Sequence, residues 1–334
     1  MERTIVRVEQ RTREVTVKEL TLRGLRIFEA AASSASFSHG AEVMGMTKSA
    51  VSQQIRQLEE ETGARLFDTM VRPIQVTDAG RELLRHARII LAQVAVASDA
   101  MKSLRGQFSG RLTLGVVQPA NYFVPYIMTA FKRLFPDVHI RMVIEKRDTL
   151  LTMLADHSID LAIGGYPTMQ PEVEAQVFAR HPHCLIVSPD HPLRGRYQLT
   201  WNDLRHEAFV FREQGSATRK FLEHLLQVQG LHVDINMELE GCEAVKQAVM
   251  AGMGISFMSA HAIQTELLAG KVAILDLADM PKWIDWCIWS RRDTDVPTIR
   301  AAFQNFVLTE GARFTTCQIS SVSGCEITEL RAAA

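Results

Sequence analysis

The sequence has few cysteines and lacks any long uncharged apolar run. Its five cysteines are Cys184, Cys242, Cys287, Cys317 and Cys325. Their odd number and the lack of CxxC spacing argue against a disulfide framework or a structural zinc site, so we expect reduced thiols. No run of about 18 uncharged apolar residues could cross a bilayer, and residues 1–19 lack the apolar core of a signal peptide. We therefore expect a cytoplasmic protein with no membrane partner.

Familiar catalytic motifs are also missing. The chain has no P-loop, nucleophile-elbow or HExxH pattern, and "GMG" at residues 252–254 follows a predicted helix instead of opening one. His181, His183 and Cys184 come nearest to a metal cluster, but strand alternation would send His183 and Cys184 to opposite faces. We predict no catalytic residue, no metal and no cofactor.

The charge is nearly balanced over the whole chain but not between its parts. The 334 residues carry 37 Lys and Arg against 38 Asp and Glu. Residues 1–110 hold 16 basic and 13 acidic side chains, or +3, and residues 111–334 hold 21 and 25, or −4. This asymmetry is too mild for bulk attraction, so any nucleic-acid binding must come from a local face. The length itself predicts two or three domains.

Residues 20–63 show three helical segments. Apolar residues at three- and four-residue steps begin at Leu20, and "SSAS" ends the first segment. A short second helix fits Ser38 to Met44, with Ser38 as its cap. The third opens with Thr47 as N-cap and closes at Gly63, a residue suited to the left-handed cap position.

The third helix has two different faces. Its apolar side consists of Val51, Ile55 and Leu58, and its opposite side of Ser49, Ser52, Gln53 and Arg56. The following "ARLFDTMVRPIQVT" indicates two short extended pieces around a turn at Arg72-Pro73. Three helices and a hairpin of this kind predict a winged helix-turn-helix.

A long helix capped by Thr77 is predicted to end at Gly106. Its apolar stripe has coiled-coil spacing and is too wide for one partner: Leu84, Ala87, Leu91, Val94, Ser98 and Met101, flanked by Leu83, Ile90, Ala97 and Leu104. A helix of roughly 30 residues is about 45 Å long and needs the helix of another chain to bury this stripe. We therefore predict a homodimer or homotetramer.

From Arg111 the pattern alternates between strands and helices. The predicted strands are "RLTLGVV", "VHIRMVIE", "IDLAIGG", "HCLIVSP", "EAFVF", "DINMELE", "GISFMS" and "WIDWCIWS", and the helices lie near residues 124–134, 148–156, 216–228 and 243–251. This alternation predicts two open α/β lobes, whose ligands bind beyond the carboxyl ends of the strands. We place the crossovers between the lobes near residues 180–182 and 283–285. The tryptophans of "WIDWCIWS" are predicted to pack in the core and not to form a stacking platform.

The run "SFSHGAEVMGMTKSAVSQQIRQLEEETGARLFDTMVRPIQVTDAG", with the long helix and the two lobes after it, resembles the LysR-type transcriptional regulators over residues 20–312. The resemblance implies a sequence-specific DNA-binding regulator with a periplasmic-binding-protein-like effector domain. Its expected parts are an N-terminal extension at 1–19, a winged helix at 20–77, a linker helix at 78–106, lobe I at 111–180 and 285–312, lobe II at 181–284, and a flexible tail at 313–334.

Several stretches also look like the Calvin-cycle regulators of carbon-fixation operons: "NYFVP", "DLAIGGYP", "HPHCLIVSPDHPL", "FREQGSATR" and "EAVKQAVMAGMGIS". The chain departs from this subgroup at Ala217, at Gly241-Cys242 and at residues 118–120. In the third helix, Lys48-Ser49 replaces the usual Gln-Pro. Beyond that helix, Thr69 replaces an Arg after Phe67-Asp68. We expect the effector and the operator to differ accordingly.

Two sets of binding residues follow. The residues expected to contact an operator in double-stranded DNA are Thr47, Lys48, Ser49, Ser52, Gln53, Arg56 and Arg72, because hydroxyl, amide and guanidinium groups bind base edges and phosphates. The residues expected to bind a small, anionic or phosphorylated metabolite are Gln118, Asn121, Tyr122, Gly164, Gly165, Gly215, Ser216, Thr218, Arg219 and Lys246, which all fall at strand ends or helix starts.

A second hypothesis belongs to another class. The α/β half could serve as a cytoplasmic small-molecule binding protein or enzyme, with the N-terminal helices for assembly. Turnover of a bound metabolite would favour this alternative, whereas an operator shift without turnover would dismiss it. The leading interpretation leaves RNA polymerase as a further candidate partner.

Overall fold

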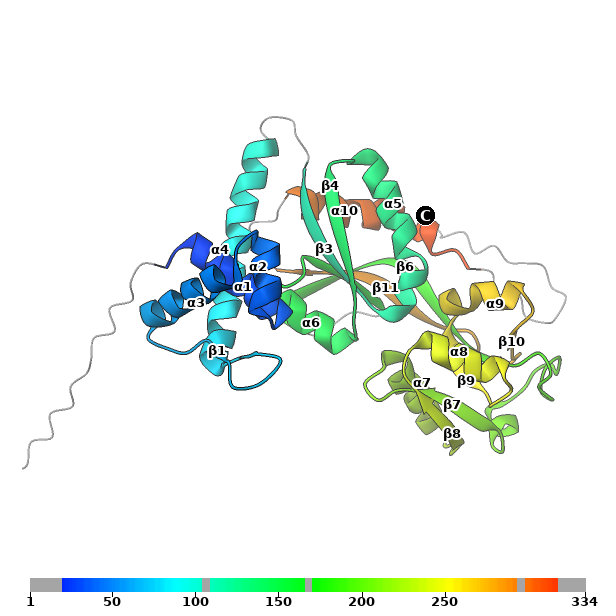
Figure 1. Ribbon diagram of the computed structural model, residues 1–334. Helices are drawn as coiled ribbons and strands as arrows, with labels where there is room; N and C mark the ends of the chain where they lie inside the picture. The colour runs from blue at the N-terminus through cyan, green and yellow to red at the C-terminus, as the bar shows by residue number, and fades with distance from the viewer. Residues whose placement is uncertain (1–19, 104–108, 166–169, 293–297, 318–334) are drawn as a thin grey trace, which may run out of the picture. The chain divides into compact units, whose positions relative to one another are not determined.

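The computed structural model describes residues 20–103, 109–165, 170–292 and 298–317 (Figure 1). The chain divides into two compact units, residues 1–95 and 96–334. The predicted N-terminal extension lies outside the described residues. Within the described part, no helix is both long and apolar enough to cross a membrane.

The first unit is a winged helix-turn-helix. It contains α1 (Leu22–Ser34), α2 (Phe37–Met44), α3 (Lys48–Thr62), and the antiparallel strands β1 (Phe67–Asp68) and β2 (Gln75–Val76). One apolar core joins them around Phe28, Val51 and Phe67. The predicted cap of the second helix was wrong: Ser36 caps α2, because its hydroxyl accepts a hydrogen bond from the His39 N–H at 3.3 Å. Ser38 lies inside the first turn.

Helix α3 has the predicted ends and the predicted buried face. Thr47 Oγ1 accepts a hydrogen bond from the Ala50 N–H at 3.2 Å, and Gly63 ends the helix with φ +67°. The buried side chains are Val51, Ile55 and Leu58. Local chemistry within one turn was therefore enough to place this helix.

Helix α4 (Asp78–Ser103) follows the wing, and the hydroxyl of Thr77 caps it by accepting from the Gly80 N–H at 3.0 Å. Leu83, Leu84, Ala87 and Leu91 pack against the winged-helix core. The first half of the predicted seam is thus partly covered within the same chain. Ile90 stays exposed, and so does Met101 further along. The predicted end at Gly106 lies outside the described residues.

A seven-stranded mixed sheet forms the framework of the second unit. Its order is β10-β6-β11-β5-β3-β4, with β9 also paired to β6. The strands are β3 (Gly110–Val116), β4 (Val138–Ile144), β5 (Leu161–Gly165), β6 (Val173–Val187), β9 (Ser256–Ser259), β10 (Ala273–Ile274) and β11 (Lys282–Arg291). The predicted strand "HCLIVSP" is only the second half of β6, because residues 173–180 also pair with β11.

Strands β6 and β11 run antiparallel through both lobes. Arg180 lies opposite Asp285, and Pro182 lies opposite Trp283. In lobe I, α5 (Val124–Leu134) and α10 (Thr298–Glu310) cover one face of the sheet, and α6 (Arg147–Ala155) covers the other (Figure 1). Trp286 and Trp289 are fully buried, as predicted for packing residues.

Lobe II adds a parallel pair of strands and three helices. The pair is β7 (Ala208–Arg212) and β8 (Asp234–Leu239), and the helices are α7 (Ala217–Val228), α8 (Cys242–Met250) and α9 (Gln264–Leu268). Its apolar cores lie on either side of the strands.

The predicted flexible tail begins too early. A 3-10 turn spans Gly311–Phe314, and the Thr315 carbonyl accepts a hydrogen bond from His261 Nε2 at 2.8 Å. Thr315 is buried, and Cys317 packs against the lobe II core. Residues 313–317 are therefore held on the domain, and residues 318–334 lie outside the described part.

Candidate functional site

The polar face of α3 points to solvent. Thr47, Lys48, Ser49, Gln53 and Arg56 are exposed, and Ser52 is half-buried. The hydroxyls of Thr47 and Ser49 lie 3.0 Å apart at the start of the helix. Among the described residues, none forms an ion pair with Arg56, so its five donors are available to a partner. The structure thus brings the predicted α3 residues together on one accessible face.

The wing is tied to α3 by a carboxylate that the sequence did not mark. Glu59 Oε1 accepts hydrogen bonds from the Leu66 N–H at 2.8 Å and the Phe67 N–H at 3.3 Å. These bonds set the direction in which the chain enters β1. Arg72, at the far end of the hairpin, is exposed.

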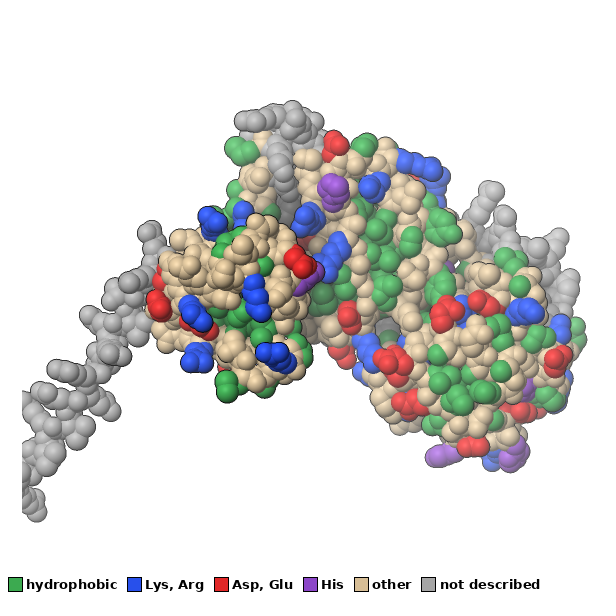
Figure 2. Space-filling model, viewed as in Figure 1, with side chains coloured by type: hydrophobic (Ala, Val, Ile, Leu, Met, Phe, Trp, Pro, Cys, Tyr) green, Lys and Arg blue, Asp and Glu red, His purple; other side chains and the backbone are tan. Residues whose placement is uncertain are grey.

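A groove beside α3 adds a basic residue to the predicted set. Ser52, Arg56, Arg65 and Thr69 line it, together with Phe37, Ile55, Glu59 and Phe67. Arg65 is exposed and lies between the cap of α3 and β1. A basic side chain between a helix cap and a wing strand is a local signal that could have found it. Figure 2 shows basic and acidic side chains on this unit, so its surface is not uniformly positive.

The effector domain contains a cavity of about 250 Å³. It opens at the carboxyl ends of β3, β4 and β5 from lobe I and of β7 and β8 from lobe II, where open α/β sheets bind ligands. Five predicted residues line it: Gln118, Gly165, Gly215, Ser216 and Thr218. Ser216 is the N-cap residue of α7, and its hydroxyl makes no capping bond.

Three other predicted residues lie elsewhere. Gly164 is needed for packing, because a Cβ there would lie 2.3 Å from the Trp289 ring. Asn121 is exposed outside the cavity. Tyr122 donates its hydroxyl hydrogen to Glu243 and also lies outside, where burial raises its pKa.

The two predicted cations Arg219 and Lys246 are also outside the cavity. Arg219 is buried and pairs with Glu223 at 2.7 Å and Glu238 at 2.6 Å. Lys246 is buried and pairs with Glu243 and Glu266, each at 2.8 Å. A buried charge requires a partner, and these carboxylates supply it, so both cations hold lobe II together.

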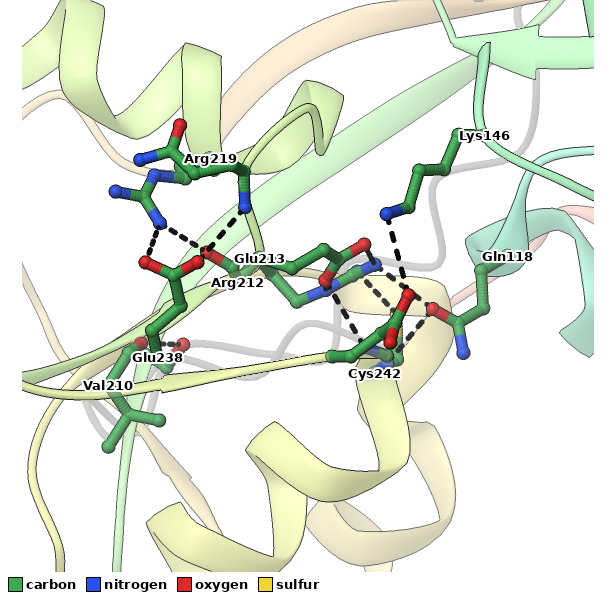
Figure 3. A network of polar contacts seen from close by, with 12 residues as sticks. Gln118, Lys146, Val210, Arg212, Glu213, Arg219, Glu238 and Cys242 are labelled. Carbon is green, nitrogen blue, oxygen red and sulfur yellow. Dashed lines mark hydrogen bonds and ion pairs between the residues drawn. The ribbon is translucent and has the colours of Figure 1, made fainter. Parts of the chain in front are cut away.

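Two cations that line the cavity, Arg212 and Lys146, were missed. Arg212, at the end of β7, donates to Glu213 at 2.8 and 3.0 Å and to Gln118 Oε1 at 3.0 Å (Figure 3). Gln118 Oε1 also accepts from the Cys242 N–H at 3.0 Å, so one lobe I side chain contacts two elements of lobe II. Burial raises the pKa of Glu213, but pairing with Arg212 outweighs this effect and leaves the pKa below its ordinary value.

Lys146 contributes a second cation at the cavity wall. It precedes α6 and lies 3.4 Å from Glu240 of lobe II (Figure 3). Both side chains are exposed, so the pair is weak and can exchange partners. His181, His183 and Trp289 also line the cavity. The spacing of the two histidines suggested only a metal site, and nothing local marks Trp289, because the fold brings these strand residues to the cavity.

Comparison with known proteins identifies both units. Residues 22–81 match the bacterial regulatory helix-turn-helix protein family, lysR type, and residues 105–311 match the LysR substrate binding domain. The chain is 36% identical over 294 residues to a RuBisCO operon transcriptional regulator of Allochromatium vinosum, covering 88% of this chain and 97% of that one. It is 38% identical over 286 residues to the HTH-type transcriptional regulator CbbR of Rhodospirillum rubrum, covering 86% and 95%.

A solved structure resembles the second unit. It is the CcmR regulatory domain of Synechocystis PCC6803 in complex with 2-PG, with a TM-score of 0.58, 29% identity, and coverage of 60% of this chain and 97% of that one. The matched domains span both units, and the relatives are regulators and not enzymes. The chain belongs to the LysR family of bacterial transcriptional regulators, within the group that controls carbon-fixation operons.

Proposed function

We propose that this regulator reads its operator with the exposed face of α3 and the wing, and binds a small anionic metabolite in the effector cavity. The observation that carries the proposal is the α3 face itself. Its hydroxyl, amide and guanidinium groups are accessible, while the opposite face is fully packed. A solvated helix normally carries more charge on its exposed face.

The side chains of α3 have distinct proposed roles. An α-helix fits the major groove, where Ser49, Ser52 and Gln53 approach base edges. Arg56 pairs bidentately with a guanine. Thr47 and the free N–H groups behind it hold a backbone phosphate, and Lys48 adds a charge there. Arg72 in the wing contacts the minor groove or its phosphates.

The lining and the size of the effector cavity favour a small anion as the effector. The start of α7, with Gly215, Ser216 and Thr218, offers a helix N-terminus, and Arg212 lies beside it. Binding sites for drug-sized ligands measure roughly 300–1,000 Å³. The cavity is smaller, which favours a phosphorylated or carboxylated acid over a nucleotide. The similar CcmR domain, whose ligand is 2-PG, supports this class of effector.

The remaining parts complete the proposed regulator. Residues 20–77 form the DNA-binding domain, residues 78–106 the linker helix, and the two lobes the effector domain with the boundaries given above. The exposed stripe of α4, which includes Ile90 and Met101, pairs two chains. A homotetramer would be built from two such dimers. RNA polymerase is the proposed partner of the DNA-bound form, and the site of action is the cytoplasm.

The DNA-binding proposal is tested with Arg56→Ala. Loss of a bidentate contact should weaken operator binding by about 1–3 kcal/mol, which is roughly 5- to 150-fold. Mobility-shift titration at fixed salt measures this loss, and genome-wide mapping of bound DNA supplies the operator. Lys132→Ala serves as a control, because Lys132 is an exposed cation on α5, in the other unit of the chain. Equal affinity of Arg56→Ala and the unmodified protein would refute the proposed role.

The effector proposal has a separate test. A panel of sugar bisphosphates, phosphorylated acids, 2-PG and nucleotides is screened for a rise in melting temperature. We expect small acids to stabilise the protein and nucleotides to have no effect. If no member changes either the melting temperature or the operator footprint, the anion site is rejected while the DNA-binding proposal stands.

A further inference from the structure

Two histidines of β6 line the effector cavity with nitrogen atoms that lack partners. His181 and His183 are separated by one residue, so they share a strand face, and each is at most 3% exposed. Their Nδ1 atoms are buried and have no hydrogen-bond partner within the described part of the chain. A buried polar atom without a partner costs free energy, so such atoms usually mark a missing ligand or water.

The ring of His181 is held in one orientation. Its Nε2 lies 2.8 Å from Ser259 Oγ, and the ring stacks on Trp286 with centroids 3.8 Å apart. Its Nδ1 faces Gly165, where an added Cβ would lie only 3.2 Å away. A side chain at residue 165, which lines the cavity, would press against this nitrogen, and glycine leaves that space free.

The ring of His183 is held by aromatic neighbours. It stacks on Phe257 at 5.2 Å and lies 4.2 Å from the His181 ring. Phe221, one turn inside α7, contacts it edge-on at 5.7 Å. This contact places the start of α7, with its proposed anion site, next to the histidines.

Both imidazoles are uncharged at neutral pH. Burial lowers the pKa of His183 to about 3 and lowers the pKa of His181 well below its usual value. A neutral imidazole nitrogen forms a hydrogen bond with a hydroxyl or carbonyl group. Each of these nitrogens therefore offers a ligand a hydrogen bond and no charge.

We propose that His181 and His183 form an oxygen-binding floor that selects small anionic metabolites with a hydroxyl or carbonyl oxygen at the end opposite their anionic group. The anionic group sits at the start of α7 beside Arg212, and the oxygen reaches the histidines. This inference rests on the proposed effector function and names the chemical class of its ligand.

The test compares how tightly two ligands bind to the unmodified protein and to histidine variants. Glycerol 3-phosphate and n-propyl phosphate share a phosphate, but only the first has hydroxyls. Calorimetry should show that the unmodified protein binds glycerol 3-phosphate about tenfold more tightly, the effect of one good hydrogen bond. In His183→Phe, which keeps a ring but removes the nitrogens of one histidine, we expect the preference to shrink, and with His181→Phe added we expect the two phosphates to bind equally.

His261→Phe is the matched control. His261 belongs to the same aromatic cluster, with its ring 5.5 Å from that of His181, but it does not line the cavity. This variant should keep the tenfold preference even where it lowers stability. Equal weakening of both phosphates in His183→Phe, or an unchanged preference, would overturn the inference.

Other outcomes separate this inference from the proposed function. If other phosphates of the panel bind but neither of these two does, only the oxygen-binding floor is rejected. If no anion binds at all, the effector site is rejected as well.

Discussion

At the scale of single residues, the buried charges of lobe II are structural. Arg219 donates to Glu223, to Glu238 and to the Arg212 carbonyl, so it joins α7, β8 and β7. Removing it would leave two carboxylates without their partner. The residue next to it, Lys220, is exposed and forms only a loose ion pair, with its Nζ 3.7 Å from Asp148 Oδ2. The two neighbours therefore make a matched pair for mutation.

We predict that Arg219→Ala lowers the free energy of unfolding by about 1–3 kcal/mol, because it removes a buried guanidinium with its hydrogen bonds to the Arg212 carbonyl and to two exposed carboxylates. Lys220→Ala should have only a small effect, because exposed pairs contribute little. Urea denaturation of both variants measures the difference. Equal losses in the two variants would contradict the structural role of Arg219.

The buried histidines predict a pH-dependent stability. Burial lowers the pKa of His261 to about 4, whereas an unfolded histidine titrates near 6.5. Below pH 6.5 the unfolded chain binds protons that the folded chain does not, so stability falls as the pH drops from about 6.5 to about 4. The slope is up to about 1.4 kcal/mol per pH unit for each such histidine. His261→Phe should reduce this slope, which denaturation at several pH values measures; an unchanged slope would contradict the assignment.

At the scale of elements, local patterns predicted most helices and strands well. Caps, glycines and apolar periodicity act within a turn or a strand, so they placed α3, α5 and β7 close to their observed bounds. The first half of β6 was missed. Its residues 173–180 become a strand through pairing with β11, more than a hundred positions along the chain, which no local pattern reports.

The contact between α3 and the wing predicts an effect on operator affinity. Glu59→Ala removes the acceptor for the Leu66 and Phe67 N–H groups, so the wing should lose its fixed direction. We expect a loss of stability of about 1–3 kcal/mol and weaker operator binding. Glu59→Gln keeps an acceptor oxygen and should retain most of both. Denaturation and mobility-shift titration test this, and the prediction fails if both variants behave alike.

At the scale of the whole molecule, regulation requires coupling between the two kinds of binding site. If the effector changes operator affinity, operator binding must change effector affinity by the same factor. Gln118 and Lys146 of lobe I contact Arg212 and Glu240 of lobe II, so a ligand that replaces these contacts can alter how the lobes close. This closure is the proposed start of the signal.

Pairing of chains is predicted to depend on the exposed stripe of α4. Ile90→Glu places a charge on that stripe, and we expect it to shift the protein from dimer toward monomer. Gln93→Glu adds the same charge at another exposed position of α4 and should leave the assembly unchanged. Light scattering after gel filtration measures both, and a dimeric Ile90→Glu would refute pairing through this stripe.

The sequence by itself determined the winged helix, the caps of α3 and the α/β character of the second unit, because these depend on neighbours a few residues apart. Only the tertiary structure decided which side chains meet in the cavity. Gln118 and Cys242 are 124 positions apart yet share a hydrogen bond. Arg219 pairs with carboxylates outside the cavity, whereas His181 and Arg212, itself paired with Glu213, line the cavity. Burial, charge pairing and strand register set these outcomes, and each depends on residues that are distant in the chain.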